Sequence, residues 1–510
     1  MRNDAPEGYE RSASWDSVGT LPYPAPPSNS VLQQPRRIGS TELIVLLFMA
    51  HPPLNLIWGA IPTAYQFSGV VALPLVVGIA GLTLMAFAIG YGSMARRIRH
   101  RGGIYSFITH GLGPAVGVGS SFVAVLAYTA LLASLIMLAC GSTIGLVANL
   151  FDVRLPMPLC IVVATAVIAA LERLRLRALV RVLVAVGLAQ AAVIIGVDVA
   201  SVAEPAGGDV SFHALDPAWL LTGSIGLALG LTMTAFIGSE SGASYVDEVR
   251  RPERTIPRAT LISYAATTVV LVISVWAISV TVGPENMVAA AQGQLQSQTG
   301  GGGHPFVQTV IELLVGPAHA LTVTELATAA LALGCLASGT MRASASSRQL
   351  SALAGDGVLP ATLKPLPDGR SPLQAGLVAP VIAGLMALVI AVTDTSIGVL
   401  YLITIAGLGI AGVLTLSSLA TITWFLRSDD TESGFFGWEG QVVAAGFAMV
   451  TTGFVFCYGL YRLPQVVPSG DTWGWTLWAA PVCAFLCGVG VVLALRAWKP
   501  HVPRGIGRTQ

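Results

Sequence analysis

The sequence predicts an all-α integral membrane protein with twelve transmembrane helices. Of its 510 residues, 54% are hydrophobic and only 10% are charged, whereas an ordinary soluble protein carries about 25% charged residues. A soluble fold could not accommodate so few charged residues. The apolar residues also form runs that can cross a bilayer, for which a helix needs about 20 residues. The net charge of +1 says nothing about nucleic acid, but no basic stripe is interleaved with aromatic residues, so no nucleic-acid partner is expected.

The expected spans follow one another along the whole chain, and several are long enough to be tilted or broken. Their ranges are 41–68, 70–95, 117–148, 157–174, 179–203, 217–246, 257–283, 320–346, 372–393, 396–426, 440–462 and 474–498.

The segments outside the spans divide the chain further. Residues 1–38 are rich in Pro, Ser and charge, which predicts a disordered tail. They lack the early apolar run of a cleaved signal peptide. We expect a core of ten helices at 39–430, two further helices at 431–498 and a second tail at 499–510. The outer loop 284–319, which contains "TGGGGH", is expected to be flexible.

The basic residues predict the orientation. Putting both termini in the cytoplasm leaves only Arg154 and Arg462 outside, among 27 Lys and Arg residues. Cytoplasmic loops are the ones that carry an excess of such residues. We therefore expect a multi-pass protein of the plasma membrane with both termini in the cytoplasm. The strong preference for Arg over Lys favours a bacterial chain.

Two of the expected spans contain helix breakers. Pro52 and Pro53 stand in the middle of span 1, in "FMAHPPLNLIWGAIP", and proline removes a backbone donor and disturbs the preceding turn. In span 6, Gly238 and Gly242 flank Glu240. Broken backbone is tolerated in a membrane where it lines a cavity, and a pair of interrupted helices points to a transporter's midplane site. The alternative is a simple kink in span 1 and a close helix contact in span 6.

Four stretches resemble the amino acid–polyamine–organocation (APC) permeases. "AFIGSES" followed by "DEVRRPERTIPRAT" is similar to the signature of that family's sixth helix. "RGGIYSFITHGLGPAVG" (101–117) resembles the loop that enters the third helix, and "SRQLSALAGDGVLPATL" (347–363) the end of the eighth. "PPLNLIWGAIPTAY" (52–65) resembles a variant of the first helix. The resemblance covers roughly residues 38–430.

The resemblance implies a five-plus-five inverted repeat with broken helices 1 and 6 and the substrate between them. The carboxylate of an amino acid would meet backbone N–H groups of helix 1, and its amino group would meet backbone carbonyls of helix 6. Carried over by position, the substrate-binding residues are Pro53, Leu54, Asn55, Leu56, Ile57, Thr234, Ala235, Phe236, Ile237 and Gly238. Glu240 would be a gating or proton-sensitive group, and Tyr128 and Trp58 are further pocket candidates.

The chain departs from the family pattern at four places, one of which is Gly355, where an arginine is usual before Asp356-Gly357. The usual Gly-Ser-Gly of the first break is replaced by Asn55-Leu56-Ile57, where Asn55 offers a side-chain donor. Trp58 is bulkier than the small residue expected at its position. Gln190 stands in span 5 where many relatives of this subgroup carry a glutamate, and that span contains no lysine. The residues therefore leave open whether transport is coupled to protons or proceeds by exchange.

The function expected from these features is secondary transport of an amino acid or related amine by alternating access. No cofactor or metal is expected, because the Cys and His residues form no metal-binding cluster and no Gly-x-x-x-x-Gly-Lys motif is present. The expected partners are the small-molecule substrate, protons and membrane lipid. A membrane-embedded enzyme acting on lipid-linked substrates and a transport-dead sensor on the same fold are the alternatives.

Overall fold

The chain is helical almost throughout the part that its computed structural model describes. That part comprises residues 37–206, 208–298, 306–365, 373–393, 398–427, 437–466, 474–498 and 505–507. Within it, the β-type pairing is a single parallel bridge between Ile38 and Val249.

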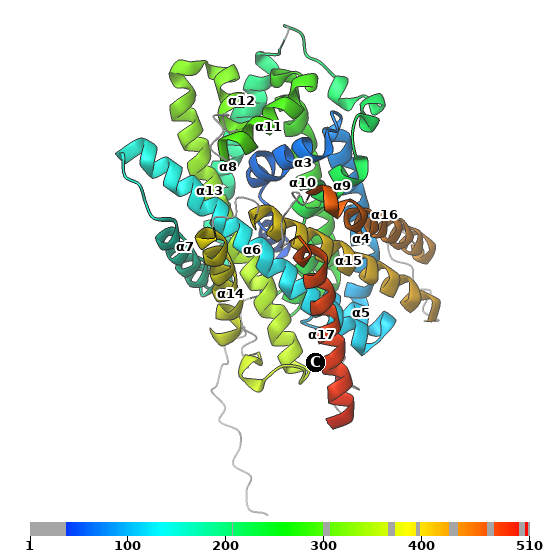
Figure 1. The fold of residues 1–510 in the computed structure, drawn as a ribbon. Coiled ribbons are helices and arrows are strands. Elements are labelled where there is room, and N and C mark those ends of the chain that lie inside the picture. The colour runs from blue at the N-terminus through cyan, green and yellow to red at the C-terminus, as the bar shows by residue number, and fades with distance from the viewer. Residues whose placement is uncertain are drawn as a thin grey trace, which may run out of the picture. The chain divides into compact units, whose positions relative to one another are not determined.

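The α-helices follow the apolar runs of the sequence (Figure 1). They are α1 (Ser40–Phe48), α2 (Pro53–Asn55), α3 (Ile61–Ser68), α4 (Leu73–Arg97), α5 (Ile104–Leu112), α6 (Pro114–Phe151), α7 (Met157–Glu172), α8 (Leu176–Ala203), α9 (Ile225–Ala235), α10 (Pro252–Val282), α11 (Met287–Gln298), α12 (Phe306–Val315), α13 (Pro317–Gly355), α14 (Leu373–Val392), α15 (Gly398–Arg427), α16 (Gly437–Val466) and α17 (Thr476–Trp498). Short turns of other helix types lie between them: a π-helix, η1 (Leu56–Ala60), and the 3-10 turns η2 (His213–Leu215), η3 (Pro217–Leu221), η4 (Ser239–Tyr245), η5 (Pro284–Asn286) and η6 (Ala361–Leu363).

Ten helical segments of the described residues are long and apolar enough to cross a membrane. They correspond to ten of the twelve predicted spans. The other two differ from the prediction in length. The predicted span 157–174 contains α7, which has 16 residues, and the predicted span 217–246 is divided into η3, α9 and η4.

Two further boundaries differ from the sequence prediction. The loop 284–319, expected to be flexible, contains α11 and α12, with 299–305 outside the described residues. Helix α13 runs to Gly355, beyond the predicted end of its span at 346. The extension matters because it places Arg342 well inside a helix rather than at its end.

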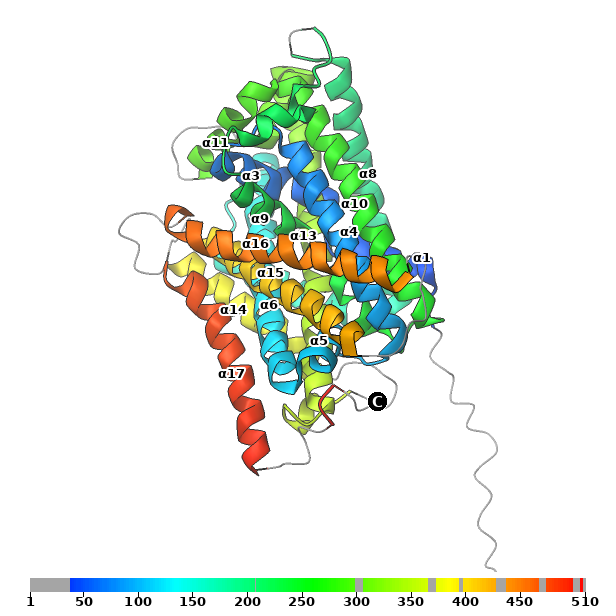
Figure 2. The same cartoon turned by 90° about the vertical axis from the view of Figure 1, so that its right-hand side faces the viewer.

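The helices pack in extended pairs. Helix α13 lies along α6, α10 lies along α4, and α15 contacts both α6 and α16; Figure 2 shows α15 and α16 crossing this part of the molecule. Small residues allow the close approach. A side chain at Gly81 of α4 would collide with Thr268 of α10, which is the close packing typical of membrane helices.

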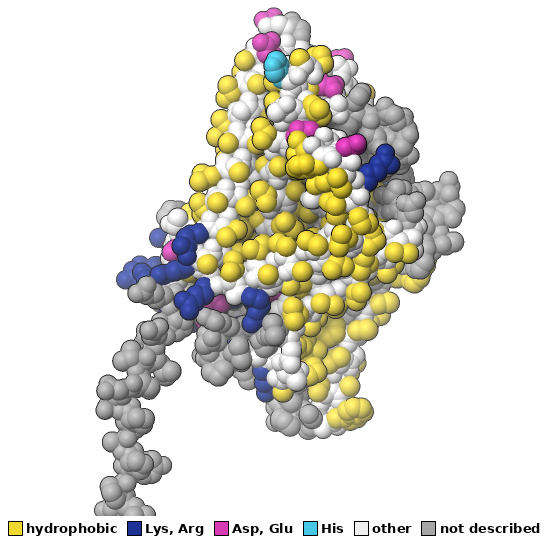
Figure 3. All heavy atoms as spheres, turned by 90° about the vertical axis from the view of Figure 1, so that its left-hand side faces the viewer, with side chains coloured by type: hydrophobic (Ala, Val, Ile, Leu, Met, Phe, Trp, Pro, Cys, Tyr) yellow, Lys and Arg dark blue, Asp and Glu magenta, His cyan; other side chains and the backbone are white. Residues whose placement is uncertain are grey.

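The surface separates apolar from charged side chains. Figure 3 shows hydrophobic side chains over most of one face, with most of the Lys and Arg side chains gathered toward one end and Asp and Glu side chains mostly toward the other. Large apolar side chains such as Leu188 and Val199 of α8 are more than half exposed. An apolar surface of this kind fits a lipid environment.

Two terminal segments contact the helices. Backbone hydrogen bonds from Ile38 N–H to the Glu248 carbonyl and from Arg250 N–H to the Ile38 carbonyl, at 2.7 and 2.9 Å, form the bridge ahead of α1. Of the predicted tail 499–510, residues 505–507 are described. There, Ile506 is buried and the Gly507 N–H donates to Asp356 Oδ2 at 2.8 Å.

Candidate functional site

The first break lies between α1 and α2. Helix α1 ends at Phe48, and the chain resumes a helix at Pro53, which takes the first helical position of α2. Proline is favoured at that position because its missing N–H would be unpaired there in any case. The unwound residues are therefore Met49–Pro52. From its two prolines, the sequence predicts unwinding near Pro52–Asn55, but Pro53–Asn55 is helical.

The second break follows α9. This helix ends at Ala235, and the chain turns through Phe236–Gly238 before the 3-10 turn η4. Gly238 has φ +134°, a conformation that side-chain-bearing residues rarely adopt. A Cβ there would also collide with Arg342 Nη1 and come within 2.7 Å of the Ala50 Cβ. The two breaks therefore touch each other, and glycine is needed where they meet.

Glu240 holds the second break in place. Its Oε1 accepts a hydrogen bond from the Tyr128 hydroxyl at 2.8 Å. Its Oε2 accepts one from the Gly238 N–H at 2.6 Å and one from the Tyr264 hydroxyl at 3.2 Å. The residue is 2% exposed. Three donors from three parts of the chain thus converge on one buried carboxylate, and charge-assisted hydrogen bonds of this kind are among the stronger ones.

His51 connects the two breaks, although the sequence analysis did not select it. Its Nε2 lies 2.7 Å from the Ser239 hydroxyl, and its Nδ1 lies 3.0 Å from the Phe48 carbonyl. The Ser239 hydroxyl in turn lies 2.9 Å from that of Ser263 on α10. The signal was an ionisable side chain directly before Pro52 in an apolar run, because such residues inside a membrane span are functional candidates by default.

Asn55 contacts neighbouring helices. Its Oδ1 accepts a hydrogen bond from Gln190 Nε2 of α8 at 2.9 Å, and its Nδ2 donates to the Cys335 sulfur of α13 at 3.3 Å. A side chain at Gly334 would collide with both Asn55 and Gln190. This bridge joins α2 to α8 and α13, and both ends of the Asn55 amide are occupied by it.

The other predicted site residues flank the breaks and are mainly apolar. Leu54, Leu56, Ile57, Trp58, Ala235, Phe236 and Ile237 are all at most 9% exposed. The Phe236 ring lies 6.3 Å from that of His51 and 6.5 Å from that of Tyr264. Trp58 packs edge-on against Phe306 at 6.2 Å. Thr234 donates its hydroxyl to the Leu231 carbonyl at 2.6 Å.

Arg342 is the second residue that the sequence analysis did not select. It is 3% exposed on α13, and its Nε and Nη1 have no hydrogen-bond partner. One turn earlier on the same helix, the Ser338 hydroxyl donates to the Ala50 carbonyl at 2.6 Å. The guanidinium thus lies where the two breaks touch. The predicted end of its span at 346 concealed this position by placing Arg342 near a cytoplasmic boundary.

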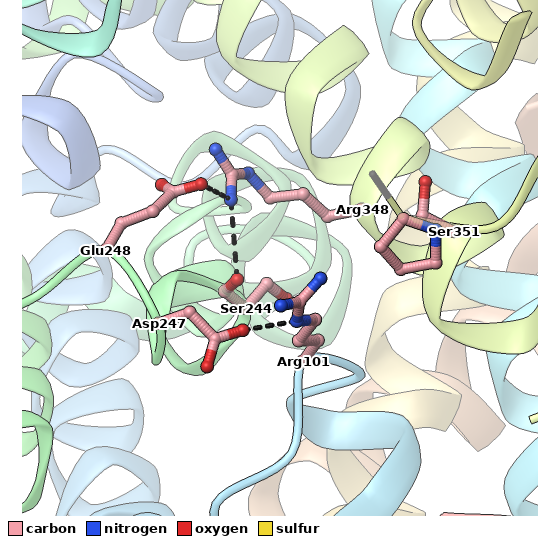
Figure 4. A pocket seen from close by; sticks show the side chains of 7 residues that line it. Arg101, Ser244, Asp247, Glu248, Arg348 and Ser351 are labelled. Atoms are coloured by element: carbon pink, nitrogen blue, oxygen red, sulfur yellow. Dashed lines mark hydrogen bonds and ion pairs between the residues drawn. The ribbon is translucent and has the colours of Figure 1, made fainter. Parts of the chain in front are cut away.

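A cluster of charged side chains closes off a pocket beyond η4 (Figure 4). The pocket is lined by Arg101, Ser244, Asp247, Glu248, Arg348, Ser351 and Pro365. Arg348 Nη1 lies 2.9 Å from Glu248 Oε1, and Arg101 forms an ion pair with Asp247. The Arg348 guanidinium also lies 4.0 Å from the centre of the Tyr245 ring. These contacts join the end of α13 to the segment after η4 and to the loop before α5.

Comparisons with known proteins agree with this geometry. The family described as amino acid permease matches residues 53–504. No curated protein matches the sequence. Among solved structures, the chain is similar to the manganese transporter of Eremococcus coleocola, crystallised in complex with an aromatic bis-isothiourea substituted compound. The TM-score is 0.54 at 14% sequence identity, over 94% of this chain and 97% of that chain. This similarity shows a shared helical transporter fold.

Proposed function

Because the chain belongs to the amino acid permease family, we propose that it moves an amino acid or a related amine across the plasma membrane by alternating access. Family membership makes the protein a transporter rather than an enzyme. The observation that carries the proposal is the meeting of two interrupted helical segments at Ala50 and Gly238. Substrate sites of such transporters lie near the bilayer midplane at discontinuous helices.

The proposed topology has twelve spans in a five-plus-five inverted repeat. It adds α7 and the interrupted segment of η3, α9 and η4 to the ten long apolar segments. Spans 1–10 then occupy the core at 39–430, spans 11 and 12 lie at 431–498, and residues 1–38 and 499–510 are the cytoplasmic tails. The distribution of Lys and Arg supports this orientation, and the preference for Arg supports a bacterial plasma membrane.

The proposed substrate site lies between Pro53–Ile57 and Thr234–Gly238, with Phe236 over the substrate. Gly238 leaves the α-helical ladder, and its carbonyl accepts hydrogen bonds from the Ser241 backbone N–H and hydroxyl. Because the two Ser241 donors occupy the Gly238 carbonyl, the carbonyls proposed to meet a substrate ammonium group are those of Phe236 and Ile237. Apart from the half-buried Thr234, the proposed site residues are buried, so substrate entry requires the helices to separate on one side.

The charged cluster is proposed as the cytoplasmic gate. The ion pairs of Arg101 with Asp247 and of Arg348 with Glu248 tie together three segments that would have to part for the site to open inward. Because the ion pairs are partly exposed, each contributes only modestly to the stability of the closed state. A gate made of such pairs can open without a large cost in free energy.

Glu240 is proposed as the group that responds to protons. It is a buried carboxylate directly beyond the second break. The titratable or charged groups that face it from the neighbouring elements are Tyr91, Tyr128, Tyr264 and Arg342, and His51 bonds its neighbour Ser239. Tyr91 also supports the backbone here, accepting from the Ala243 N–H at 2.7 Å and donating to the Glu240 carbonyl at 2.9 Å.

The test of the proposed function is uptake by the purified protein in liposomes. A panel of radiolabelled amino acids and polyamines is offered with and without an inward proton gradient, and protein-free liposomes give the background. Saturable uptake of at least one compound is expected. Absence of uptake and of exchange across the whole panel would refute the proposed function.

A further inference from the structure

The strongest unexplained feature of the site is the unpaired guanidinium at its centre. Arg342 is 3% exposed, and no carboxylate within the described residues lies at ion-pairing distance from it. Taking a charge out of water is costly in free energy unless a partner compensates it. Glu240, on the adjoining turn, already accepts three hydrogen bonds from other groups. A bound ligand can supply the partner that the guanidinium lacks.

The first break has few backbone donors with which to bind an anion. Pro52 and Pro53 have no N–H group. The Asn55 N–H donates to the Pro52 carbonyl at 3.1 Å, and α2 is only three residues long before the π-helix begins. A carboxylate bound at this break would therefore gain from donors supplied by another part of the chain.

Arg342 supplies donors at that place. Ser338, one turn before it on α13, holds the Ala50 carbonyl of the first break, and Arg342 Nη1 lies over the backbone of Gly238 in the second break. Nε and Nη1 are buried and have no hydrogen-bond partner, and either can act together with Nη2 toward the two oxygens of one carboxylate. A guanidinium presents its N–H groups as a planar fork that matches the two oxygens of a carboxylate.

We propose that Arg342 binds the carboxylate of the substrate, in place of the backbone donors that Pro52 and Pro53 remove. This inference rests on the proposed transport function and narrows its substrate class to compounds that carry a carboxylate. A zwitterionic amino acid would then lie with its carboxylate on Arg342 and its ammonium toward Glu240 and the carbonyls of the turn at Phe236–Gly238. A decarboxylated amine would leave the guanidinium unpaired and would bring a second positive charge next to it.

The first experiment uses the wild-type protein in liposomes. Uptake of the amino acid that it transports best is challenged with three unlabelled competitors: the same amino acid, its methyl ester and its decarboxylated amine. Because hydrogen bonds to charged groups are the costly ones to lose, the ester and the amine are expected to compete about tenfold to a hundredfold more weakly. Equal competition by the ester would overturn the inference while leaving the transport function intact. If no compound of the panel is transported, the proposed function fails and the inference fails with it.

The second experiment compares Arg342→Gln and Arg342→Lys with a control, Arg181→Gln, which changes an exposed arginine on α8. Arg342→Gln is expected to weaken the apparent affinity for the amino acid about tenfold or more and that for the amine less than about threefold. Retained binding of the amine would also show that the site is folded. Arg342→Lys keeps the positive charge but not the planar fork. Its apparent affinity for the amino acid should therefore lie between that of the wild type and that of Arg342→Gln. An equal loss for amino acid and amine would assign Arg342 a role in holding the breaks together, and no loss for either would show that it does not bind the substrate. Either result would refute the inference. If the variants do not purify as monodisperse protein, the ester comparison on the wild type decides.

Discussion

The imidazole of His51 and the hydroxyl of Ser239 lie 2.7 Å apart, although the residues are 188 positions apart in the chain. This hydrogen bond joins the first break to the second. Ser239 continues the connection to Ser263 at 2.9 Å, and Thr267 lies 3.3 Å from His51 Nδ1. Both breaks are thus connected to α10, so a movement of one break changes the contacts of the other.

Replacing His51 should uncouple the breaks. In His51→Ala, the Ser239 hydroxyl loses its imidazole partner and a cavity forms, so we expect a loss of about 1–3 kcal/mol in folding stability and a clear fall in uptake. The midpoint of thermal unfolding in detergent and the initial rate of uptake measure the two effects. His319→Ala, outside this site, is the control. Unchanged stability and uptake in His51→Ala would contradict a connecting role.

Gly238→Ala should abolish transport. The positive φ of Gly238 and the collision of a new Cβ with Arg342 and Ala50 both oppose the substitution, and strained backbone of this kind costs about 1–3 kcal/mol. Gly141→Ala is the matched control, because a Cβ at Gly141 of α6 meets nothing within 4 Å. Uptake by each variant, normalised to monodisperse protein, is the measurement. Wild-type uptake by Gly238→Ala would show that the break is not held as described.

Glu240→Gln should flatten the response of uptake to pH. If the carboxylate takes up a proton during transport, the amide cannot, and uptake should no longer rise with an inward proton gradient, whereas exchange of pre-loaded substrate should persist. An amide is also a poorer acceptor here, because Tyr128, Gly238 and Tyr264 all donate to the carboxylate oxygens and its NH2 group cannot accept. A moderate loss of thermal stability is therefore expected as well. A normal gradient response in the variant would exclude Glu240 as the coupling group.

The bridge between Asn55 and Gln190 should contribute to stability. A double-mutant cycle of Asn55→Ala and Gln190→Ala is expected to give a coupling energy of about 0.5–1.5 kcal/mol, measured from thermal unfolding. The same variants test the substrate contact predicted for Asn55 from the sequence. A tenfold rise in KM for Asn55→Ala alone would support that contact, and additive stabilities would show that the bridge contributes nothing.

The proposed gate can be tested by chemical labelling. Arg348→Gln removes the pair with Glu248 and the contact with the Tyr245 ring, so the segment that carries Ser244 should open more often. A cysteine introduced as Ser244→Cys is then expected to react several-fold faster with a membrane-impermeant reagent from the cytoplasmic side. The background needs its exposed cysteines replaced, which are Cys457, Cys483 and Cys487.

The control for this labelling is Arg99→Gln. The pair of Arg99 with Glu253 is more exposed, at 57% and 34% of the two side chains, and exposed pairs contribute little. Its loss should leave the reaction rate nearly unchanged. Equal rates in Arg348→Gln and in the parent would show that the Arg348 pair does not keep this side closed.

The helices were predictable from the sequence because their signals are local. Runs of apolar residues placed most spans within a few residues, and Gly238 marked the second break. The position of the first break was less predictable, since a proline pair fits both the end of one helix and the start of the next, and Pro53 takes the latter role. The helices α11 and α12 were not predicted, because the glycine tract between them indicated a flexible loop over 284–319.

The centre of the site could not be predicted in the same way. The contacts of His51 and Arg342 depend on which helices lie against the breaks, and that depends on packing between segments far apart in the sequence. Asn55 shows a related limit. Its position in the sequence predicts a ligand contact, which stays a prediction, and the structure adds contacts of its side chain with Gln190 and Cys335 that no local pattern reveals.

The bridge between Ile38 and Val249 has a consequence for biosynthesis. Val249 follows Ile38 by almost half the chain, so the ribosome finishes several spans before the residue just ahead of α1 can find its partner. The first helix must therefore enter the membrane with its leading end still unpaired. A nascent chain arrested before residue 249 should expose Ile38 to protease, and one arrested after α10 should protect it.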